Sequence, residues 1–544
     1  MGAVDKSGWV LGAVLARQGA ALRDKPYVQF QDDPPLTFGD MDNRANRVAN
    51  ALAAMGVQRD ERVLLMMPNS VEFLDSWFGV SRLGAVMVPV NTAYKGGFLE
   101  HVINNAAVNG SARVMIIDRE YVPLLQASED RVPQLETVVV RNAKGSKTDL
   151  PSFSRLRAVS FDSLFDAPDT TVQVPVAYHD IGAIMYTSGT TGPSKGVLMP
   201  HAHLYLYGHA KIKAIRLTAD DIYYCCMPLF HANALLMQVY SALIVGCRLV
   251  LARSFSASRW LDDVRRHGAT VTNTLGVMTE FIYRQPPRAE DRDHHLRVIV
   301  AVPIAPEWGE AFQQRFNTRL LEGYGMTEVN IPTYMPYEDN LRDHSCGKVL
   351  DEWFEMAIVD PETDEELPPN TVGEMVVRPR EPWVFMAGYH AMPEKTVEAW
   401  RNFWFHTGDA GTRDEEGYFY FVDRMKDCIR RRGENISSYE IEQVLNDHPA
   451  VAESAAVAVK SSIAGGEDEV KACVLLRPEM RLQPGELLDY CQERMPYFAV
   501  PRYVEFVSDM PKTPTEKLRK HILREAGITA ATWDREAAGY VVRR

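Results

Sequence analysis

The stretch from Tyr186 to His201, YTSGTTGPSKGVLMPH, constrains this chain more than any other. Its core holds five hydroxyl side chains, three glycines and one lysine, namely Thr187, Ser188, Thr190, Thr191 and Ser194, then Gly189, Gly192 and Gly196, and Lys195. Hydroxyl and backbone N–H groups donate hydrogen bonds to phosphate oxygens, and glycines let the backbone approach closely. Because apolar residues flank this core on both sides, we predict a strand, a phosphate-binding loop and a second strand.

Two other interpretations of this stretch fit less well. No register supplies the G-x-x-x-x-G-K-[ST] pattern of a Walker A loop. A flexible linker would not need buried-type strands on both sides, or a proline and a lysine inside it. The stretch closely resembles the phosphate-loop signature of the adenylate-forming (ANL) superfamily, which includes acyl-CoA synthetases, peptide-synthetase adenylation domains and firefly luciferase.

Composition limits the remaining classes of protein. The chain has 544 residues and a net charge of −13, so several domains are expected and nonspecific nucleic-acid binding is not. Seven scattered cysteines without a C-x-x-C pair indicate reduced thiols and a cytoplasmic protein. The most apolar stretch, residues 232–252, contains polar side chains and is interpreted as a buried helix and strand, not a membrane span. The oligomeric state stays open, with a homodimer as one alternative.

The order of elements predicts an α/β protein. Helical and strand patterns alternate over residues 1–180 and again over 248–300, which favours parallel sheets covered by helices. Short alternating runs over 345–423 indicate a small antiparallel unit. The resemblance implies the acyl-CoA synthetase fold. Residues 1–423 would form a large N-terminal domain with two αβαβα-type subdomains and a small β-barrel, and residues 424–544 a mobile α+β domain with its hinge near Lys426.

A second match is the run Glu322-Gly323-Tyr324-Gly325-Met326-Thr327-Glu328. Tyr324 offers a flat ring on which adenine can stack. Thr327 offers a hydroxyl to the α-phosphate, and Glu328 a hard oxygen ligand for Mg²⁺. The resemblance implies that Glu322, Gly323, Tyr324, Gly325 and Thr327 contribute to ATP binding, with Glu328 as the metal ligand.

A third match, Trp404-Phe405-His406-Thr407-Gly408-Asp409, places a carboxylate where the family holds ribose. A carboxylate can accept hydrogen bonds from both vicinal hydroxyls of a ribose. Arg424 resembles the family arginine that also reaches the ribose. The phosphate loop would add Thr187, Ser188, Gly189, Thr190, Thr191, Gly192 and Lys195 to the ATP site.

The C-terminal part carries the remaining family positions. Lys517, in Pro511-Lys512-Thr513-Pro514-Thr515-Glu516-Lys517, resembles the adenylation lysine, although Glu516 replaces the usual glycine. The resemblance assigns CoA binding to Arg432, Gly433 and Glu434. The arginine triplet at 430–432 either neutralises CoA phosphates or forms a solvated basic edge. The run RRRGENIS looks most like the carnitine/crotonobetaine and bile-acid CoA ligase branch.

The acyl pocket is predicted from three segments near residues 231–237, 300–305 and 324–333, which are mostly apolar and suit a hydrophobic acid. His231 resembles a family position beside the acyl pocket and the thiol tunnel. At 301–305 the chain has Ala-Val-Pro-Ile-Ala where the family usually has a glycine-rich run.

These motifs predict an AMP-forming acyl-CoA synthetase, an acid–thiol ligase. It would convert a carboxylate, ATP and CoA into acyl-CoA, AMP and diphosphate through an acyl-adenylate, with Mg²⁺. The catalytic residues would be Lys517, Thr327, Glu328 and His231. One alternative is a stand-alone adenylation enzyme that loads a carrier protein. Another, of a different class, is a non-catalytic nucleotide-binding regulator.

Overall fold

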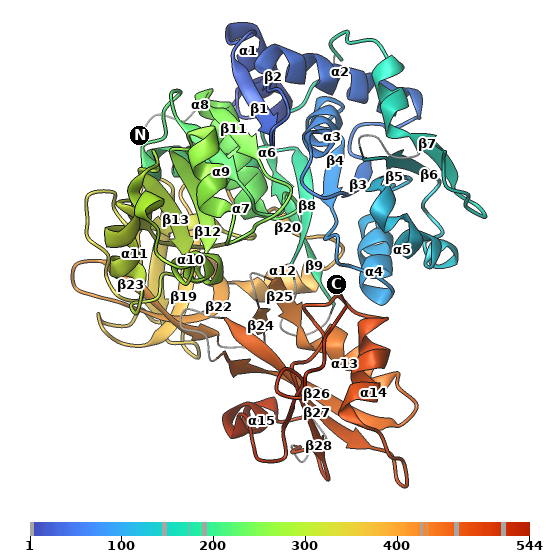
Figure 1. Ribbon diagram of the computed structural model, residues 1–544, viewed down its shortest axis with the longest axis vertical. Coiled ribbons are helices and arrows are strands. Elements are labelled where there is room, and N and C mark those ends of the chain that lie inside the picture. Colours follow the sequence, from blue (N-terminus) through green and yellow to red (C-terminus); the bar gives the residue numbers. More distant parts are fainter. Residues whose placement is uncertain are drawn as a thin grey trace. The chain divides into compact units, whose positions relative to one another are not determined.

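The computed structural model describes residues 5–143, 149–172, 174–187, 193–424, 428–431, 434–461, 467–512 and 518–543. The chain forms two compact units, coloured along the sequence in Figure 1. The first comprises Met1–Thr92, Ile103–Tyr186 and Gly196–Asp423. The second comprises Ala93–Val102, Thr187–Lys195 and Arg424–Arg544.

The helices are mostly short. They are α1 (Leu11–Ala21), α2 (Phe38–Ala54), α3 (Val71–Arg82), α4 (Gly97–Ala106), α5 (Val122–Gln126), α6 (His201–Ile215), α7 (Ala232–Ala234), α8 (Ser241–Val245), α9 (Trp260–His267), α10 (Gly276–Tyr283), α11 (Gly309–Phe316), α12 (Pro393–Ala399), α13 (Ser438–Asn446), α14 (Pro484–Gln492) and α15 (Lys520–Ala526). A π-helix, η4 (Leu235–Tyr240), connects α7 to α8.

Two largely parallel sheets form most of the first unit. One has the order β20-β9-β8-β4-β3-β5-β6-β7, built from β3 (Arg62–Met66), β4 (Val86–Pro89), β5 (Val114–Asp118), β6 (Thr137–Arg141), β7 (Arg157–Ser160), β8 (Ile181–Thr187), β9 (Lys195–Pro200) and β20 (Gly388–Tyr389). The other has the order β14-β13-β12-β10-β11-β1-β2, built from β1 (Pro26–Phe30), β2 (Leu36–Thr37), β10 (Ile222–Cys225), β11 (Arg248–Leu251), β12 (Val271–Leu275), β13 (Val298–Val302) and β14 (Arg319–Leu321). Central strands such as β5 are buried throughout, as expected for parallel strands with both faces covered.

The third sheet of the first unit is antiparallel in its registered pairs. Its path is β15-β16-β17-β23-β22-β19-β18, and β21 (Trp400–Arg401) pairs with β22. The strands are β15 (Gly323–Met326), β16 (Asn330–Tyr334), β17 (Ser345–Val349), β18 (Phe354–Val359), β19 (Gly373–Pro379), β22 (Trp404–Arg413) and β23 (Tyr418–Arg424). This sheet carries the second and third sequence matches on β15 and β22.

The second unit has its own sheets and core. A hairpin joins β24 (Cys428–Arg431) to β25 (Glu434–Ser437). A four-stranded sheet has the order β26-β27-β28-β29, with β26 (Val451–Lys460), β27 (Asp468–Leu476), β28 (Tyr503–Val507) and β29 (Trp533–Asp534). Helices α13 and α14 supply Leu445 and Leu488 to the core beside this sheet.

Local sequence explains why α2 begins and ends where it does. The Thr37 hydroxyl accepts a hydrogen bond from the Asp40 N–H, and the Asp40 carboxylate accepts one from the Thr37 N–H. This capping box satisfies two backbone donors at the start of the helix. Gly56 follows the helix at a φ of 88°, a conformation that glycine adopts without strain.

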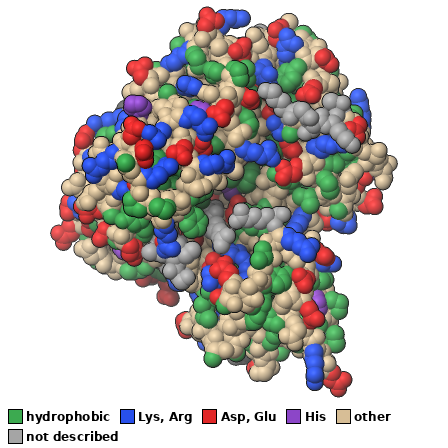
Figure 2. All heavy atoms as spheres, viewed as in Figure 1, with side chains coloured by type: hydrophobic (Ala, Val, Ile, Leu, Met, Phe, Trp, Pro, Cys, Tyr) green, Lys and Arg blue, Asp and Glu red, His purple; other side chains and the backbone are tan. Residues whose placement is uncertain are grey.

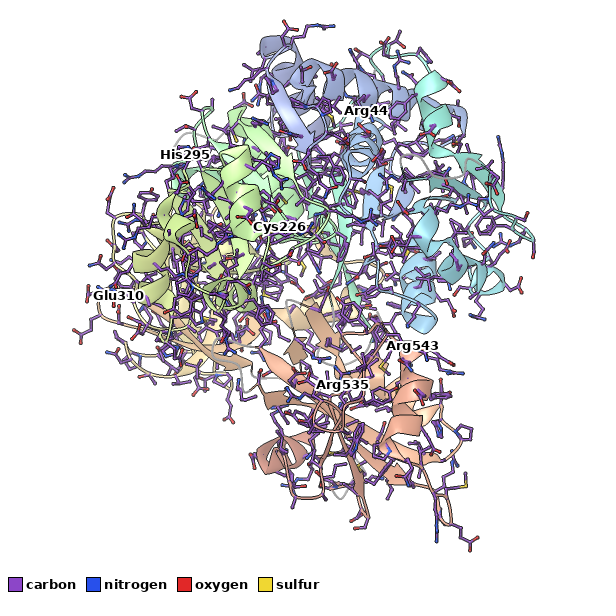
Figure 3. All side chains as sticks on the ribbon, viewed as in Figure 1. Arg44, Cys226, His295, Glu310, Arg535 and Arg543 are labelled. Carbon is purple, nitrogen blue, oxygen red and sulfur yellow. The ribbon has the colours of Figure 1, made fainter. Side chains whose placement is uncertain are left out.

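The thiols of the described cysteines are free and buried, at Cys225, Cys226, Cys247, Cys346, Cys473 and Cys491. Cys226, labelled in Figure 3, lies just after β10 in the first unit. Burial raises the pKa of the Cys225 thiol to about 12, which makes it unreactive at neutral pH. Figure 2 shows Lys and Arg side chains interspersed with Asp and Glu on the visible face. Within the described ranges, no helix combines the length and the apolarity needed to cross a bilayer.

Candidate active site

Strands β15 and β22 bring the second and third sequence matches together. The Tyr324 hydroxyl donates a 2.6 Å hydrogen bond to Oδ2 of Asp409, although 85 residues separate the two. Both side chains are buried, so this bond to a carboxylate is well shielded from water. The Phe421 ring lies with its centroid 6.5 Å from that of Tyr324, at an interplanar angle of 26°. The hydrogen bond brings together the aromatic ring predicted to bind adenine and the carboxylate predicted to bind ribose.

The two glycines of the Gly-Tyr-Gly run are required by packing. A Cβ on Gly325 would lie 2.3 Å from the Asn330 carbonyl oxygen, and one on Gly323 would lie 2.7 Å from the Thr333 carbonyl oxygen. Both contacts are far shorter than van der Waals distance. The glycines therefore allow β15 to lie close to β16, which holds Tyr324 at its position.

Helix α6 fixes the backbone at the end of β15. The His203 ring lies 2.9 Å from the Thr327 carbonyl oxygen through Nε2 and 2.7 Å from the Val384 carbonyl oxygen through Nδ1. Tyr207, one turn further along, donates to the Met326 carbonyl oxygen at 2.8 Å. Burial lowers the pKa of His203 to about 4, so the ring is neutral and donates to one carbonyl at a time. Sequence reasoning missed both side chains.

The Glu328 carboxylate is buried and oriented by a tyrosine. The Tyr389 hydroxyl donates to Oε1 of Glu328 at 3.0 Å, and the Met386 N–H donates to the Glu328 carbonyl oxygen at 3.0 Å. Burial and the Glu328 charge raise the pKa of Tyr389, so the phenol stays protonated and remains a donor. Tyr389 lies on β20, whose distance from the motif in sequence hid this contact.

Glu322 connects the motif to the 301–305 segment. Its Oε2 accepts a 2.9 Å hydrogen bond from the Ile304 N–H. Burial raises the pKa of Glu322 to about 8, so the carboxyl is largely protonated at neutral pH. A neutral Glu322 positions the backbone of a predicted acyl-pocket segment. Its predicted contribution to ATP binding stays a prediction.

His231 stands at the start of the predicted acyl-pocket helix. It occupies the N-cap of α7 and is half-buried, with its ring 4.6 Å from that of Phe230. The following residues form the π-helix η4, which the sequence pattern did not predict. Single-turn π-helices are frequent at functional sites, because they change the direction of side chains within a helix.

The two strands predicted on either side of the phosphate loop are present. Thr187 ends β8 and Lys195 begins β9, and both residues are half-buried. Next to Lys195, the Ser194 N–H and hydroxyl donate to Oε1 of Glu440 at 3.1 and 2.9 Å within the second unit. Burial raises the pKa of Glu440 to about 7. Sequence reasoning missed Glu440 as well.

Several predicted residues lie outside the described part of the chain. These are Ser188, Gly189, Thr190, Thr191, Gly192, Lys426, Arg432, Gly433 and Lys517. Arg424 ends β23. Glu434 begins β25 and is half-buried.

Two members of the arginine triplet form ion pairs within the second unit, and one of them is buried. Arg431 is buried and pairs with Glu469 at 2.6 Å, and Arg430 pairs with Glu467 at 2.8 Å. Neither predicted alternative, CoA phosphate binding or a solvated edge, describes Arg431. Its guanidinium instead satisfies a buried carboxylate and donates to the Phe498 carbonyl oxygen at 2.8 Å.

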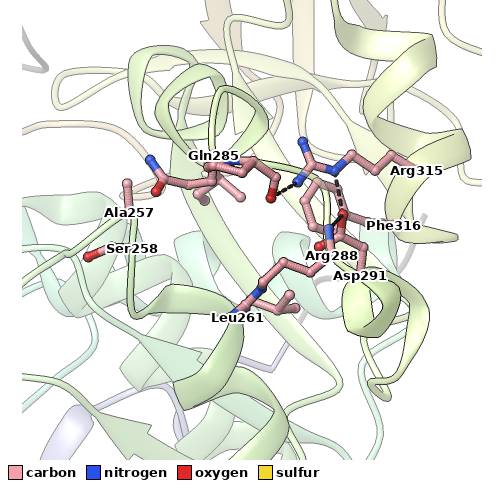
Figure 4. A pocket seen from close by; sticks show the side chains of 10 residues that line it. Ala257, Ser258, Leu261, Gln285, Arg288, Asp291, Arg315 and Phe316 are labelled. Atoms are coloured by element: carbon pink, nitrogen blue, oxygen red, sulfur yellow. Dashed lines mark hydrogen bonds and ion pairs between the residues drawn. The ribbon is translucent and has the colours of Figure 1, made fainter.

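A small pocket in the first unit lies apart from all predicted residues (Figure 4). Its lining includes Leu261 of α9 and Phe316 of α11. Its charged groups are already paired, since Nε of Arg315 lies 2.6 Å from the Asp291 carboxylate. The pocket therefore offers little to a polar ligand and is not the candidate site.

One carboxylate stands in the predicted magnesium position. Within the described ranges, no three His, Cys, Asp or Glu side chains gather as a metal site. Mg²⁺ commonly takes one or two carboxylates together with water and substrate phosphates. Glu328, with one oxygen bonded to Tyr389, fits that mode of binding and does not fit a cage made of protein ligands alone.

Solved structures of similar fold cover nearly the whole chain. The ATP-bound MatB from Rhodopseudomonas palustris has a TM-score of 0.68 and 26% identity, covering 95% of this chain and 98% of that one. The anthranilate CoA ligase AuaEII in complex with anthranoyl-AMP has a TM-score of 0.69 and 27% identity, covering 95% and 96%. The fold is that of the acyl-CoA synthetases, and the predicted α/β fold class is confirmed.

Sequence comparison gives the family. Residues 15–390 match the AMP-binding enzymes, and residues 440–517 match the C-terminal domain of these enzymes. The crotonobetaine/carnitine–CoA ligase of Salmonella paratyphi C (strain RKS4594) is 31% identical over 90% of this chain and 93% of its own length. The chain belongs to the AMP-binding enzyme family. The predicted superfamily and enzyme class, an AMP-forming acid–thiol ligase, are confirmed.

Proposed function

We propose that this enzyme joins a carboxylic acid to CoA in two steps at the expense of ATP. In the first step a carboxylate oxygen attacks the α-phosphorus, and the bond to the diphosphate breaks, which gives acyl-AMP and diphosphate. In the second step the CoA sulfur attacks the acyl carbon, AMP leaves with the bonding electrons, and the thiol proton is released. The observation that carries the proposal is the buried hydrogen bond between Tyr324 and Asp409.

The first unit supplies the groups that hold the adenylate. Asp409 accepts hydrogen bonds from the ribose hydroxyls, and Tyr324 presents its ring to adenine. The Thr327 hydroxyl binds an α-phosphate oxygen, and His203 and Tyr207 keep its backbone in place. Mg²⁺ held by Glu328 would offset the phosphate charge. Catalysis of this kind depends on positioning and charge stabilisation more than on covalent chemistry by the protein.

Sequence resemblance supplies the remaining roles. The loop at 187–195 would bind the β- and γ-phosphates, Arg424 the ribose, and Lys517 the charge that develops during adenylation. Residues 1–423 would form the adenylation domain and residues 424–544 a mobile domain that turns about Lys426. Arg432, Gly433 and Glu434 would then line the CoA path. We place the enzyme in the cytoplasm and leave a homodimer as one assembly state.

The acid is proposed to have an apolar body. The predicted pocket segments supply buried Met237, Val300, Ile304 and Ala305. These side chains favour hydrocarbon over water. Similarity to the crotonobetaine/carnitine–CoA ligase supports a CoA acceptor and does not fix the acid, because substrate choice depends on the pocket and not on the fold.

The test is a screen of aliphatic, alicyclic and aromatic carboxylic acids with ATP and Mg²⁺. Diphosphate release is measured with and without CoA, and thioesters are identified by mass spectrometry. Acid-dependent diphosphate release and acyl-CoA formation support the proposal. Adenylation without a thioester on free CoA would instead favour the carrier-protein alternative. ATP binding without diphosphate release from any acid would favour the non-catalytic regulator.

A further inference from the structure

Lys211 is a buried lysine with an incomplete set of partners. It lies on α6 with no exposed surface, and its ammonium donates one 3.0 Å hydrogen bond, to Oδ1 of Asn273. Among the described residues, no carboxylate forms an ion pair with it. An ammonium has three donors, and burying one without an anion is costly. Burial accordingly holds the pKa of Lys211 well below its usual range.

The surroundings of Lys211 are polar and also incompletely bonded. Asn273 Nδ2 donates to Oδ1 of Asn233 at 2.7 Å, and Gln238 Nε2 donates to the same oxygen at 3.2 Å. Oε1 of Gln238 and the hydroxyl of Tyr334 are buried without a hydrogen-bond partner in the described structure. The Tyr334 ring centroid lies 5.8 Å from the Lys211 ammonium. Buried groups of this kind usually have partners, so the cluster has unused capacity to bind a polar group.

This cluster lies where the three predicted acyl-pocket segments meet. Asn233 belongs to the segment at 231–237. Asn273 stands opposite Val300 in the register of β12 and β13. Tyr334 ends β16, directly after the segment at 324–333. Lys211 thus introduces an ionisable amine into a site that the sequence had indicated to be apolar.

Helix α6 sets how far Lys211 lies from the reacting carboxylate of the substrate. His203, Tyr207 and Lys211 follow one another at intervals of four residues and share one face of the helix. The first two bond to the carbonyls of Thr327 and Met326. Lys211 therefore stands two helical turns, about 12 Å of rise, beyond His203. A group bound to it belongs to the far end of the acid.

We propose that Lys211 binds a second, anionic group at the distal end of the substrate, so that the substrate is an acid with an apolar body and a terminal carboxylate or equivalent anion. This inference rests on the proposed function. An anion would complete the hydrogen bonds of the ammonium and of the Tyr334 hydroxyl. A cationic tail would disfavour the protonated form of Lys211 and offer it no hydrogen-bond acceptor, and a hydrocarbon tail would leave the cluster unbonded.

The test compares acids of equal length that end in a carboxylate, a methyl, a hydroxyl or a trimethylammonium group, over a homologous series. Acyl-CoA formation is measured for the full chain and for Lys211→Met and Lys211→Arg. Lys213→Met is the matched control, since Lys213 lies on the same helix, is half exposed and pairs with Glu352. The readout is kcat/KM for the carboxylate-ended acid divided by kcat/KM for the methyl-ended acid of equal length. This ratio is independent of the folded fraction of a variant.

The carboxylate-ended acid of the best length should exceed its methyl-ended counterpart by at least about tenfold, the smallest effect that measured charge-pair couplings imply. Lys211→Met should abolish this ratio, whereas Lys211→Arg and Lys213→Met should retain it. Preference for a methyl, hydroxyl or trimethylammonium end, or an unchanged ratio in Lys211→Met, would overturn the inference. Thioester formation in those cases would leave the proposed function intact. No thioester or adenylate from any acid would refute the proposed function itself.

Discussion

Replacing Glu322 with glutamine tests whether a buried carboxyl is neutral beside the adenylate site. Burial raises the pKa of Glu322 from 4.5 to about 8. Between these values the folded state keeps the proton and the unfolded state loses it, so this carboxyl destabilises the fold as the pH rises. Each pH unit well inside this range lowers the free energy of unfolding by about 1.4 kcal/mol. The loss between pH 4.5 and pH 7 is about 3 kcal/mol in all.

Glu322→Gln keeps the acceptor for the Ile304 N–H and cannot ionise. The free energy of unfolding of the variant minus that of the natural chain should therefore increase by about 3 kcal/mol when the pH is raised from 4.5 to 7. Urea midpoints followed by tryptophan fluorescence at both pH values measure this difference. Glu394→Gln, at an exposed position on α12, serves as the control for the change in net charge. A stability difference that does not change with pH would show that Glu322 is ionised in the folded enzyme and would refute this argument.

Substitutions at four further positions address the proposed roles. Tyr324→Phe keeps the ring, so it should raise the KM for ATP less than Tyr324→Ala does, and equal effects would exclude stacking. Asp409→Ala should raise the KM for ATP by at least about tenfold, since hydrogen bonds to a charged group contribute about 1.5–3 kcal/mol; an unchanged KM would exclude the ribose contact. Lys517→Ala should lose adenylation yet form thioester from supplied acyl-AMP, and equal loss of both steps would contradict its role. Lys426→Pro should release diphosphate but stall thioester formation, and normal overall turnover would argue against a hinge there.

Sequence alone was sufficient where a short motif carries the chemistry or the local fold. The two strands flanking the phosphate loop depend on neighbouring residues, and both follow the predicted pattern. The Tyr324 and Asp409 motifs were each recognisable, although only the folded chain shows that the two side chains are hydrogen-bonded. Motifs identify candidate groups, whereas contacts between distant strands decide how those groups are oriented.

Sequence was insufficient where a side chain's role depends on distant partners. In the helical run HAHLYLYGHAKI, the spacing of His203, Tyr207 and Lys211 was visible, but their partners lie more than 60 residues away. Arg431 was expected either to neutralise CoA phosphates or to lie on a solvated edge, because Glu469, which pairs with it, lies on another strand. The π-helix η4 has no pattern that distinguishes it from an α-helix. Each of these features results from packing between segments that are far apart in the sequence.

Exchange of labelled diphosphate into ATP tests the central claim most directly, because it requires reversible formation of an acyl-adenylate and no CoA. With Mg²⁺ and a suitable acid, the enzyme should catalyse this exchange without CoA, and Asp409→Ala should slow it. Exchange that is absent with every acid, or that appears only when CoA is added, would contradict the account.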